Sequence, residues 1–205
     1  MRTNSIFRAC VWLSRIGYCR GFGIQSPWAY SFVRYVVNEH YPYYKYKEVA
    51  EYFNGINVLQ RKMGEFYLRL ANFAQPSYIV SSYCSDDKVK YSEAYFCAGC
   101  KRCRFNSYAN DEFWDVLANR DADDGPYIVQ INGLYVEKEM LSELVDILHD
   151  GDFIVVERAD CGKKTVRFCE DVYANLLGIL LFDLYYCDVI YVDSKRYMHK
   201  YIINF

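Results

Sequence analysis

The sequence is poor in the residues that divide a chain into separate units. Its 205 residues include four prolines and 11 glycines, and no stretch rich in proline, glycine or serine forms a linker. Hydrophobic residues make up 53% of the chain, which is enough for one substantial core. We therefore expect one structural domain, in which residues 1–75 form a helical cap and lead-in helix and residues 76–205 form the sheet.

Long hydrophobic runs are also missing from the sequence. The longest late run, around LLGILLF, is well short of the length that spans a bilayer. The N-terminal segment shows no small-residue cleavage site of a secretory signal. The nine cysteines are an odd number, which argues against a framework of disulfides. These features predict a cytoplasmic protein with reduced thiols and no transmembrane segment.

The chain has little net charge and few histidines. A formal charge of -2 gives no overall field that would attract nucleic acid or an anionic membrane, so either partner would need a local patch. We expect no nucleic-acid partner. None of the three histidines belongs to a motif with a serine or cysteine nucleophile, and no Gly-x-Ser-x-Gly sequence is present. Nucleophilic catalysis therefore has no support.

The first residues, MRTNSIFRACVWLSRIGYCRG, have the pattern of a short amphipathic helix. Its apolar face consists of Ile6, Cys10 and Leu13. Such a face can contact a membrane or a partner, but packing on the protein's own core is the more common outcome. We expect core packing here.

Periodicity and punctuation residues predict the other elements. Ser26 and Pro27 are typical of a helix start, and that helix should end near Asn38. A tyrosine-rich connection, YPYYKYKE, follows it. Apolar residues spaced by three and four predict further helices over 57–75, 111–118, 136–148 and 164–177. Apolar runs predict strands over 77–83, 93–99, 126–131, 152–157, 179–186, 188–193 and 200–205.

The alternation of these strands and helices predicts the fold class. It implies crossover connections and an α/β, Rossmann-like, mostly parallel wound sheet with helices on both faces. The last three strands follow one another without a helix. We expect the final two to form an antiparallel hairpin over residues 194–197.

This order of elements is similar to that of class I S-adenosylmethionine-dependent methyltransferases. In particular, the chain resembles bacterial methyltransferase-like proteins that carry a His-Gly-x-His-Ser-Pro-Phe motif in an N-terminal cap. The segment GFGIQSPW, residues 21–28, lies in the corresponding place. Gly23, Ser26 and Pro27 match the motif, whereas both histidines and the phenylalanine are replaced.

The resemblance implies cofactor motifs that this sequence has lost. The first strand should lead into a glycine-containing loop, because only glycine lets the backbone approach the cofactor closely. Residues 81–87, SSYCSDD, contain no glycine. The acid expected after the second strand is replaced by YFCA, residues 95–98, with Glu93 nearby. The family's Asp-Gly-x-His becomes NGLY at 132–135, and its paired aspartates become ERAD at 157–160.

Four altered motifs predict a degenerate member that acts as a non-catalytic binding or interaction module and needs no cofactor. Its partner would be an unidentified protein or small molecule, and its oligomeric state is open. The alternative is an atypical methyltransferase with an unknown substrate and an S-adenosylmethionine site around Ser81, Ser82, Asp86 and Gly133. An open crevice beyond the first strand would favour this enzyme, and a crevice filled by Tyr83 or Phe96 would exclude it.

A third alternative is metal binding by Cys97, Cys100 and Cys103. Thiolates at this spacing can converge on zinc or an iron–sulfur cluster. A ferredoxin-type site would continue with a fourth cysteine and a proline, but Ser107 and Tyr108 stand there. Free thiols near the end of a strand are the favoured interpretation of these three cysteines.

Overall fold

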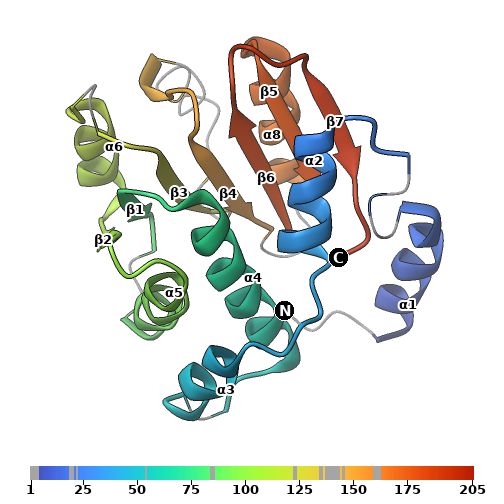
Figure 1. The fold of residues 1–205 in the computed structure, drawn as a ribbon. Coiled ribbons are helices and arrows are strands. Elements are labelled where there is room, and N and C mark those ends of the chain that lie inside the picture. The colour runs from blue at the N-terminus through green and yellow to red at the C-terminus, as the bar shows by residue number, and fades with distance from the viewer. Residues whose placement is uncertain are drawn as a thin grey trace.

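The computed structural model describes residues 5–18, 21, 23–53, 55–83, 86–121, 124–133, 136, 144, 146–158 and 163–205. A seven-stranded sheet lies at the centre, in the order β2-β1-β3-β4-β6-β5-β7 (Figure 1). Its strands are β1 Tyr78–Ser81, β2 Arg104–Ser107, β3 Tyr127–Asn132, β4 Phe153–Glu157, β5 Ile179–Asp183, β6 Cys187–Val192 and β7 His199–Ile202.

The sheet is mostly parallel. Strands β1 to β4 pair in parallel, β6 runs antiparallel to both β4 and β5, and β7 pairs in parallel with β5. The helical elements are α1 Ser5–Ser14, η1 Ile16–Tyr18, α2 Pro27–Phe32, η2 Val33–Val37, α3 Tyr44–Glu51, α4 Val58–Ala74, α5 Asp86–Gly99, α6 Asn110–Ala118 and α8 Lys163–Asn175. This arrangement confirms the predicted α/β fold class.

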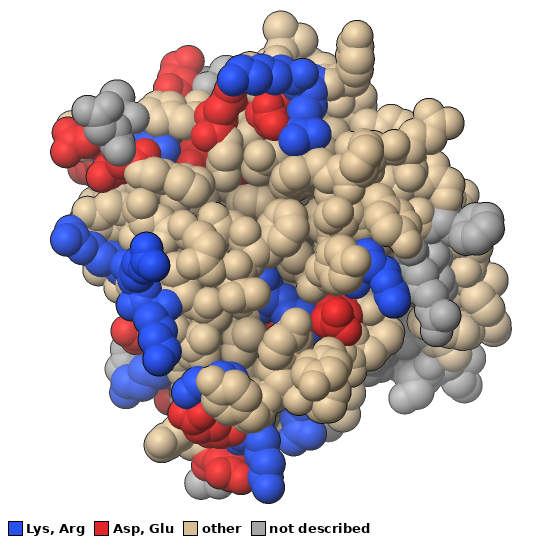
Figure 2. All heavy atoms as spheres, in the orientation of Figure 1, with Lys and Arg blue, Asp and Glu red and all other residues tan. Residues whose placement is uncertain are grey.

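Helices cover both faces of the sheet and create two cores, because successive strand residues point to opposite faces. Ile79 and Val155 face a core shared with α2, η2, α4 and α5. Val80 and Ile154 face the other core, which includes residues of α6 and α8. Uncharged side chains fill most of the middle of the face in Figure 2, with a few charged ones among them, and larger groups of charged side chains lie at the left, top and bottom.

The lead-in helix α4 begins and ends where its sequence predicts. The side chain of Asn57 accepts a hydrogen bond from the Gln60 amide, and the Gln60 side chain accepts one from the Asn57 amide. This capping box fixes the first turn. Gln75 adopts the left-handed conformation with φ 47°, and Pro76 prevents further helix.

The strand predicted at residues 93–99 is wrong, because these residues form the second half of α5. Its aromatic run is rich in strand-forming residues, yet Phe96 is fully buried and stacks on Tyr67 of α4 at 4.7 Å between ring centroids. A Cβ at Gly99 would lie 2.1 Å from the Leu68 carbonyl oxygen, so α4 and α5 pack in close contact. This packing overrides the local strand preference.

Two further predictions need correction. The last two strands do not pair with each other, and the antiparallel hairpin joins β5 to β6. The tyrosine-rich connection is not a loop throughout, since residues 44–51 form α3. Pro42 lies just before this helix, and the pair Lys45–Glu48 joins neighbouring turns.

Most of the helix predicted at 136–148 lies outside the described residues. Within the part of the chain that the structure describes, no helix is long and apolar enough to cross a membrane.

Candidate functional site

A crevice opens at the carboxyl ends of β1, β3 and β4. In a wound sheet this is the usual ligand position, because the strand order reverses between β1 and β3. The cavity has a volume of about 660 Å³, which lies in the range of small-molecule sites. The segment between α3 and α4 and the first turns of α5 complete its wall. Its aromatic lining consists of Tyr52, Phe53, Tyr67, Tyr83, Tyr91 and Tyr186.

Glu157, the last residue of β4, is the centre of a hydrogen-bond network in this crevice. The hydroxyls of Tyr67 and Tyr83 donate to its two carboxylate oxygens. The side-chain amide of Gln130 donates to the oxygen that also accepts from Tyr67, at 2.8 Å. Both oxygens of this carboxylate are therefore engaged by the protein itself.

Tyr83 lies across the floor of the crevice. It follows β1, whereas Glu157 ends β4, so their hydrogen bond crosses the end of β3, which lies between them. The Tyr83 side chain is buried, and the Lys88 ammonium lies 4.7 Å from its ring centroid. Burial, with the Glu157 charge as the second cause, raises the pKa of Tyr83 and of Tyr67 well above the ordinary value. Both phenols therefore stay protonated at neutral pH.

The two candidate serines connect strands. Ser81 is fully buried, and its hydroxyl donates to the Gln130 side chain at 3.0 Å. The hydroxyl of Ser82 accepts from the Asn132 amide at 2.9 Å. Gln130 in turn donates to Ser92 of α5 at 3.2 Å. The serine hydroxyls thus join β1 to β3 inside the protein.

The other two candidate cofactor-binding residues are Asp86 and Gly133. Asp86 is the first residue of α5, and its side chain lies outside the described residues. Gly133 follows β3, and its amide donates to the Glu157 carbonyl at 3.0 Å. A Cβ at Gly133 would lie 2.1 Å from that carbonyl oxygen and 2.7 Å from the Thr165 hydroxyl. Close packing alone therefore accounts for glycine at this position.

Replacing Gly133 with alanine is expected to lower the free energy of unfolding by about 1–3 kcal/mol, because the added carbon must displace backbone. Urea unfolding measures the change. Gly17→Ala is the matched control, since nothing lies within 4 Å of a Cβ there. Equal stability of the Gly133 variant and the wild type would contradict this packing explanation.

The sequence offered no clean candidate for the family's acid after the second strand, and the residues considered for that place, 93–98, lie in α5 and not at the end of β2. The nearby Glu93 belongs to α5, and the true strand ends at Ser107, followed by Tyr108.

The sequence drew attention to Tyr83 but gave no role to Tyr67, a helix residue far along the chain from Glu157. Gln130 carried a signal, since it is a polar residue inside an apolar strand.

The three clustered cysteines lie around the end of α5 and the turn that leads into β2. Cys97 is part of α5, Cys100 follows it, and Cys103 precedes β2. The Cys103 thiol donates to the Cys100 carbonyl at 3.0 Å, and Cys100 is buried. Among the described residues, no group of three histidine, cysteine or acidic side chains is placed to hold a metal ion.

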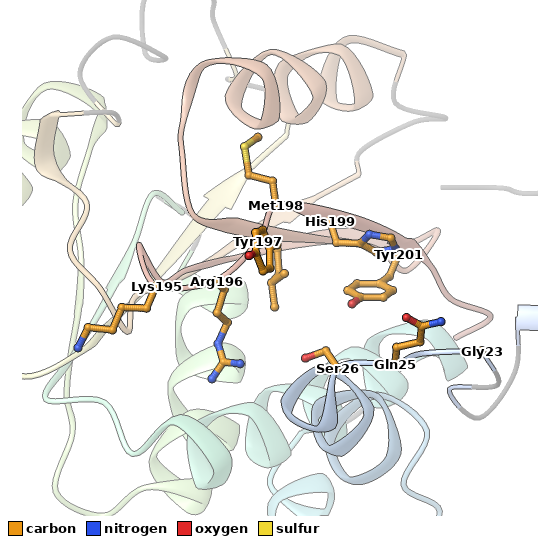
Figure 3. A pocket seen from close by; sticks show the side chains of 10 residues that line it. Gly23, Gln25, Ser26, Lys195, Arg196, Tyr197, Met198, His199 and Tyr201 are labelled. Carbon is orange, nitrogen blue, oxygen red and sulfur yellow. The ribbon is translucent and has the colours of Figure 1, made fainter.

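A second cavity, of about 520 Å³, lies between the start of α2 and the segment that leads into β7. Figure 3 shows Gln25 and Ser26 opposite His199 and Tyr201. The cap segment that resembles the family motif therefore lines this cavity, at the edge of the sheet remote from β1 and β3. The Ser26 hydroxyl accepts from the Ala29 amide and caps α2.

Similarity to known proteins is found in the fold of the chain and not in its sequence. No protein-family model matches the chain, and no curated protein matches it. The S-adenosylhomocysteine-bound methyltransferase PaMTH1 of Podospora anserina is similar in structure, with a TM-score of 0.50 and 12% identity. The match covers 94% of this chain and 98% of that one. The chain therefore has a methyltransferase-like fold.

A candidate methyltransferase from Thermobifida fusca YX aligns over 63% of this chain and 65% of its own, at 11% identity. Its TM-score of 0.33 is too low to support any inference.

Proposed function

We propose that this chain is a methyltransferase-fold binding protein that performs no methyl transfer and takes a small molecule in its aromatic-lined crevice. One observation carries the proposal. The Tyr83 side chain crosses the end of β3 and is bound to Glu157, at the point where a wound sheet receives its ligand. A cofactor at that point would have to displace a buried ring and break its hydrogen bond.

The chemistry of the network supports binding over catalysis. A general base needs a pKa near the working pH and a free position beside the substrate. Both oxygens of Glu157 already accept hydrogen bonds, and the phenols of Tyr67 and Tyr83 stay protonated. The space outside Tyr83 is lined by rings, which favour flat or apolar ligands.

Calorimetric titration with S-adenosylmethionine and S-adenosylhomocysteine tests the loss of the cofactor site. We expect no heat and no thermal stabilisation at millimolar ligand. Micromolar binding, about -8 kcal/mol, would overturn the proposal. Tyr83→Ala is the informative variant. If it binds either ligand and the wild type does not, the Tyr83 ring is what closes the cofactor position.

A thermal-shift screen of small aromatic molecules tests the binding role. Hits should lose several-fold affinity in Tyr52→Ala, whose ring lines the crevice yet is 79% exposed and therefore adds little to folding. Tyr197→Ala, 96% exposed and outside the crevice lining, is the control, and because Tyr197 lines the second cavity, loss of affinity in this variant alone would place the ligand there. Hits whose affinity changes in neither variant would show that the ligand binds elsewhere.

The second candidate function is an atypical S-adenosylmethionine-dependent methyltransferase, with Ser81, Ser82, Asp86 and Gly133 near the cofactor. Two observations favour it. The crevice of about 660 Å³ has room for a ligand beside Tyr83, and the similar Podospora anserina protein is a methyltransferase with bound S-adenosylhomocysteine. Cofactor binding to the wild type would move this function to first place.

A further inference from the structure

The N-terminal helix α1 and the following turn η1 expose a row of large apolar side chains. Trp12 is 51% exposed, Leu13 59%, Ile16 54% and Tyr18 51%. The sequence pattern predicted packing on the core, but Cys10 and Leu13 of the predicted apolar face are exposed. Trp12, Leu13, Ile16 and Tyr18 together make up the α1 face.

Polar contacts hold α1 in this orientation. The Arg15 guanidinium makes two hydrogen bonds to the Asp183 carboxylate, at 2.9 and 3.0 Å. Asn204, near the C-terminus, donates from its side chain to the Trp12 carbonyl and from its amide to the Tyr18 carbonyl, both at 3.3 Å. Figure 1 shows α1 beside the chain's C-terminal end, at the β7 edge of the sheet. These polar contacts fix the segment, and Trp12, Leu13, Ile16 and Tyr18 remain exposed on it.

The charge of this part of the chain is strongly asymmetric. Residues 1–38 contain five arginines and no acidic residue, and the rest of the chain has 19 basic against 26 acidic side chains. One of the five, Arg15, is paired with Asp183, so the attraction rests on the other four. The small net charge thus conceals a basic N-terminal segment. A surface that complements it must be anionic.

The chemistry of the α1 face matches a lipid interface. Tryptophan and tyrosine favour the headgroup level of a bilayer, where an apolar ring can be buried and its polar atom stays hydrated. Amphipathic helices with tryptophan and leucine on the apolar face and basic residues on the polar face lie in the plane of anionic membranes. Helix α1 carries one arginine, Arg8, and Arg15 follows its last residue. A second copy of the chain is a poorer occupant, because two basic segments would face each other.

We propose that the α1 face docks the protein on an anionic lipid surface, with Trp12, Leu13, Ile16 and Tyr18 entering the boundary between headgroups and acyl chains. This site is independent of the crevice. In this proposal the α1 face attaches the protein to one leaflet of the bilayer and does not cross it.

Flotation with vesicles tests the proposal. The full chain should float with vesicles of equal parts phosphatidylcholine and phosphatidylserine, and much less with phosphatidylcholine alone. Added salt should weaken flotation, because it screens the arginines. Trp12→Ser with Leu13→Ser should reduce partitioning at least about tenfold, since each loses an inserted apolar side chain.

Leu177→Ser with Tyr197→Ser is the matched control, because these side chains are 84% and 96% exposed elsewhere. An equal loss in this control would contradict the role of the α1 face, as would absence of flotation with anionic vesicles. All four positions are exposed, so thermal midpoints should agree. Self-association that the Trp12 and Leu13 changes abolish, without vesicle binding, would overturn the proposal in favour of a dimer contact.

Discussion

Replacing Asp152 with alanine is expected to lower the free energy of unfolding by about 3–5 kcal/mol. Asp152 is fully buried and accepts two hydrogen bonds from the Arg120 guanidinium, at 2.6 and 3.3 Å. It also accepts from the backbone amides of Tyr127 and His149, at 2.8 and 2.9 Å. One carboxylate therefore joins the end of α6, the start of β3 and the turn before β4.

The size of the effect follows from what the substitution leaves behind. The Arg120 side chain is only 4% exposed and lies 4.0 Å from the Tyr127 ring centroid, so its charge would stay buried without a counter-ion. Two backbone amides would also lose their acceptor, and each unsatisfied group adds a desolvation cost. The thermal midpoint should fall by roughly 6–20 °C in a chain of this length.

Urea unfolding and calorimetry measure this loss, and Lys47→Ala provides the matched control. Lys47 pairs with Glu51 at 3.9 Å on the surface, where the side chains are 86% and 68% exposed. Its loss should change stability by less than about 0.5 kcal/mol. If the two variants were equally stable, the buried pair would contribute no more than a surface pair.

The sequence predicted the fold where local patterns and tertiary packing agree. The apolar positions of α4 recur without interruption, and β1, β3 and β4 are short apolar runs buried on both faces. These strands lie inside a parallel sheet, and such strands show continuous hydrophobic runs. Local sequence therefore carried enough information for the layers of the domain.

Strand pairing could not be predicted in the same way. The turn between β5 and β6 contains no glycine or proline, and Tyr185 adopts a positive φ of 72° there. The polar segment 193–198 looks more like a hairpin turn, although it leads to a strand that pairs in parallel with β5. Turn chemistry misleads when a tyrosine occupies the position that glycine normally takes.

The candidate site was predicted in part. The carboxyl end of β1 could be recognised from the strand, and Ser81 and Ser82 lie there as expected. The hydrogen-bond network around Glu157 could not be predicted, because Tyr67, Gln130 and Glu157 come from three elements that are distant in the sequence. Only the folded chain brings these three side chains together, and cofactor binding by the four candidate residues stays a prediction.

Replacing Arg158 with methionine should be comparably damaging, by about 3–5 kcal/mol. Arg158 follows β4, and its guanidinium donates to the Asp188 carboxylate of β6 and pairs with Asp183 of β5 at 2.9 Å. The Asp188 side chain is only 2% exposed. Methionine keeps much of the volume but leaves this carboxylate without its cation.

The double variant Arg158→Met with Asp188→Asn separates charge from packing. It removes both charges of the buried pair, so most of the lost stability should return, and the double-mutant cycle measures the coupling. Failure of Asp188→Asn to recover stability would indicate that packing of the arginine stem, and not its charge, dominates.

The pH dependence of Arg158→Met gives a second test of the same network. In the wild type, burial raises the pKa of Asp188, and Arg158 opposes that rise. Without Arg158 the pKa of Asp188 must rise further, so the folded variant binds a proton at a pH where the unfolded chain has released it. A raised carboxyl pKa costs stability above that pKa, and the cost disappears below the unfolded value. The deficit of the variant should therefore shrink as the pH falls from neutral toward about 3.9. A deficit that stays constant over this range would show that Asp188 is not the group left uncompensated.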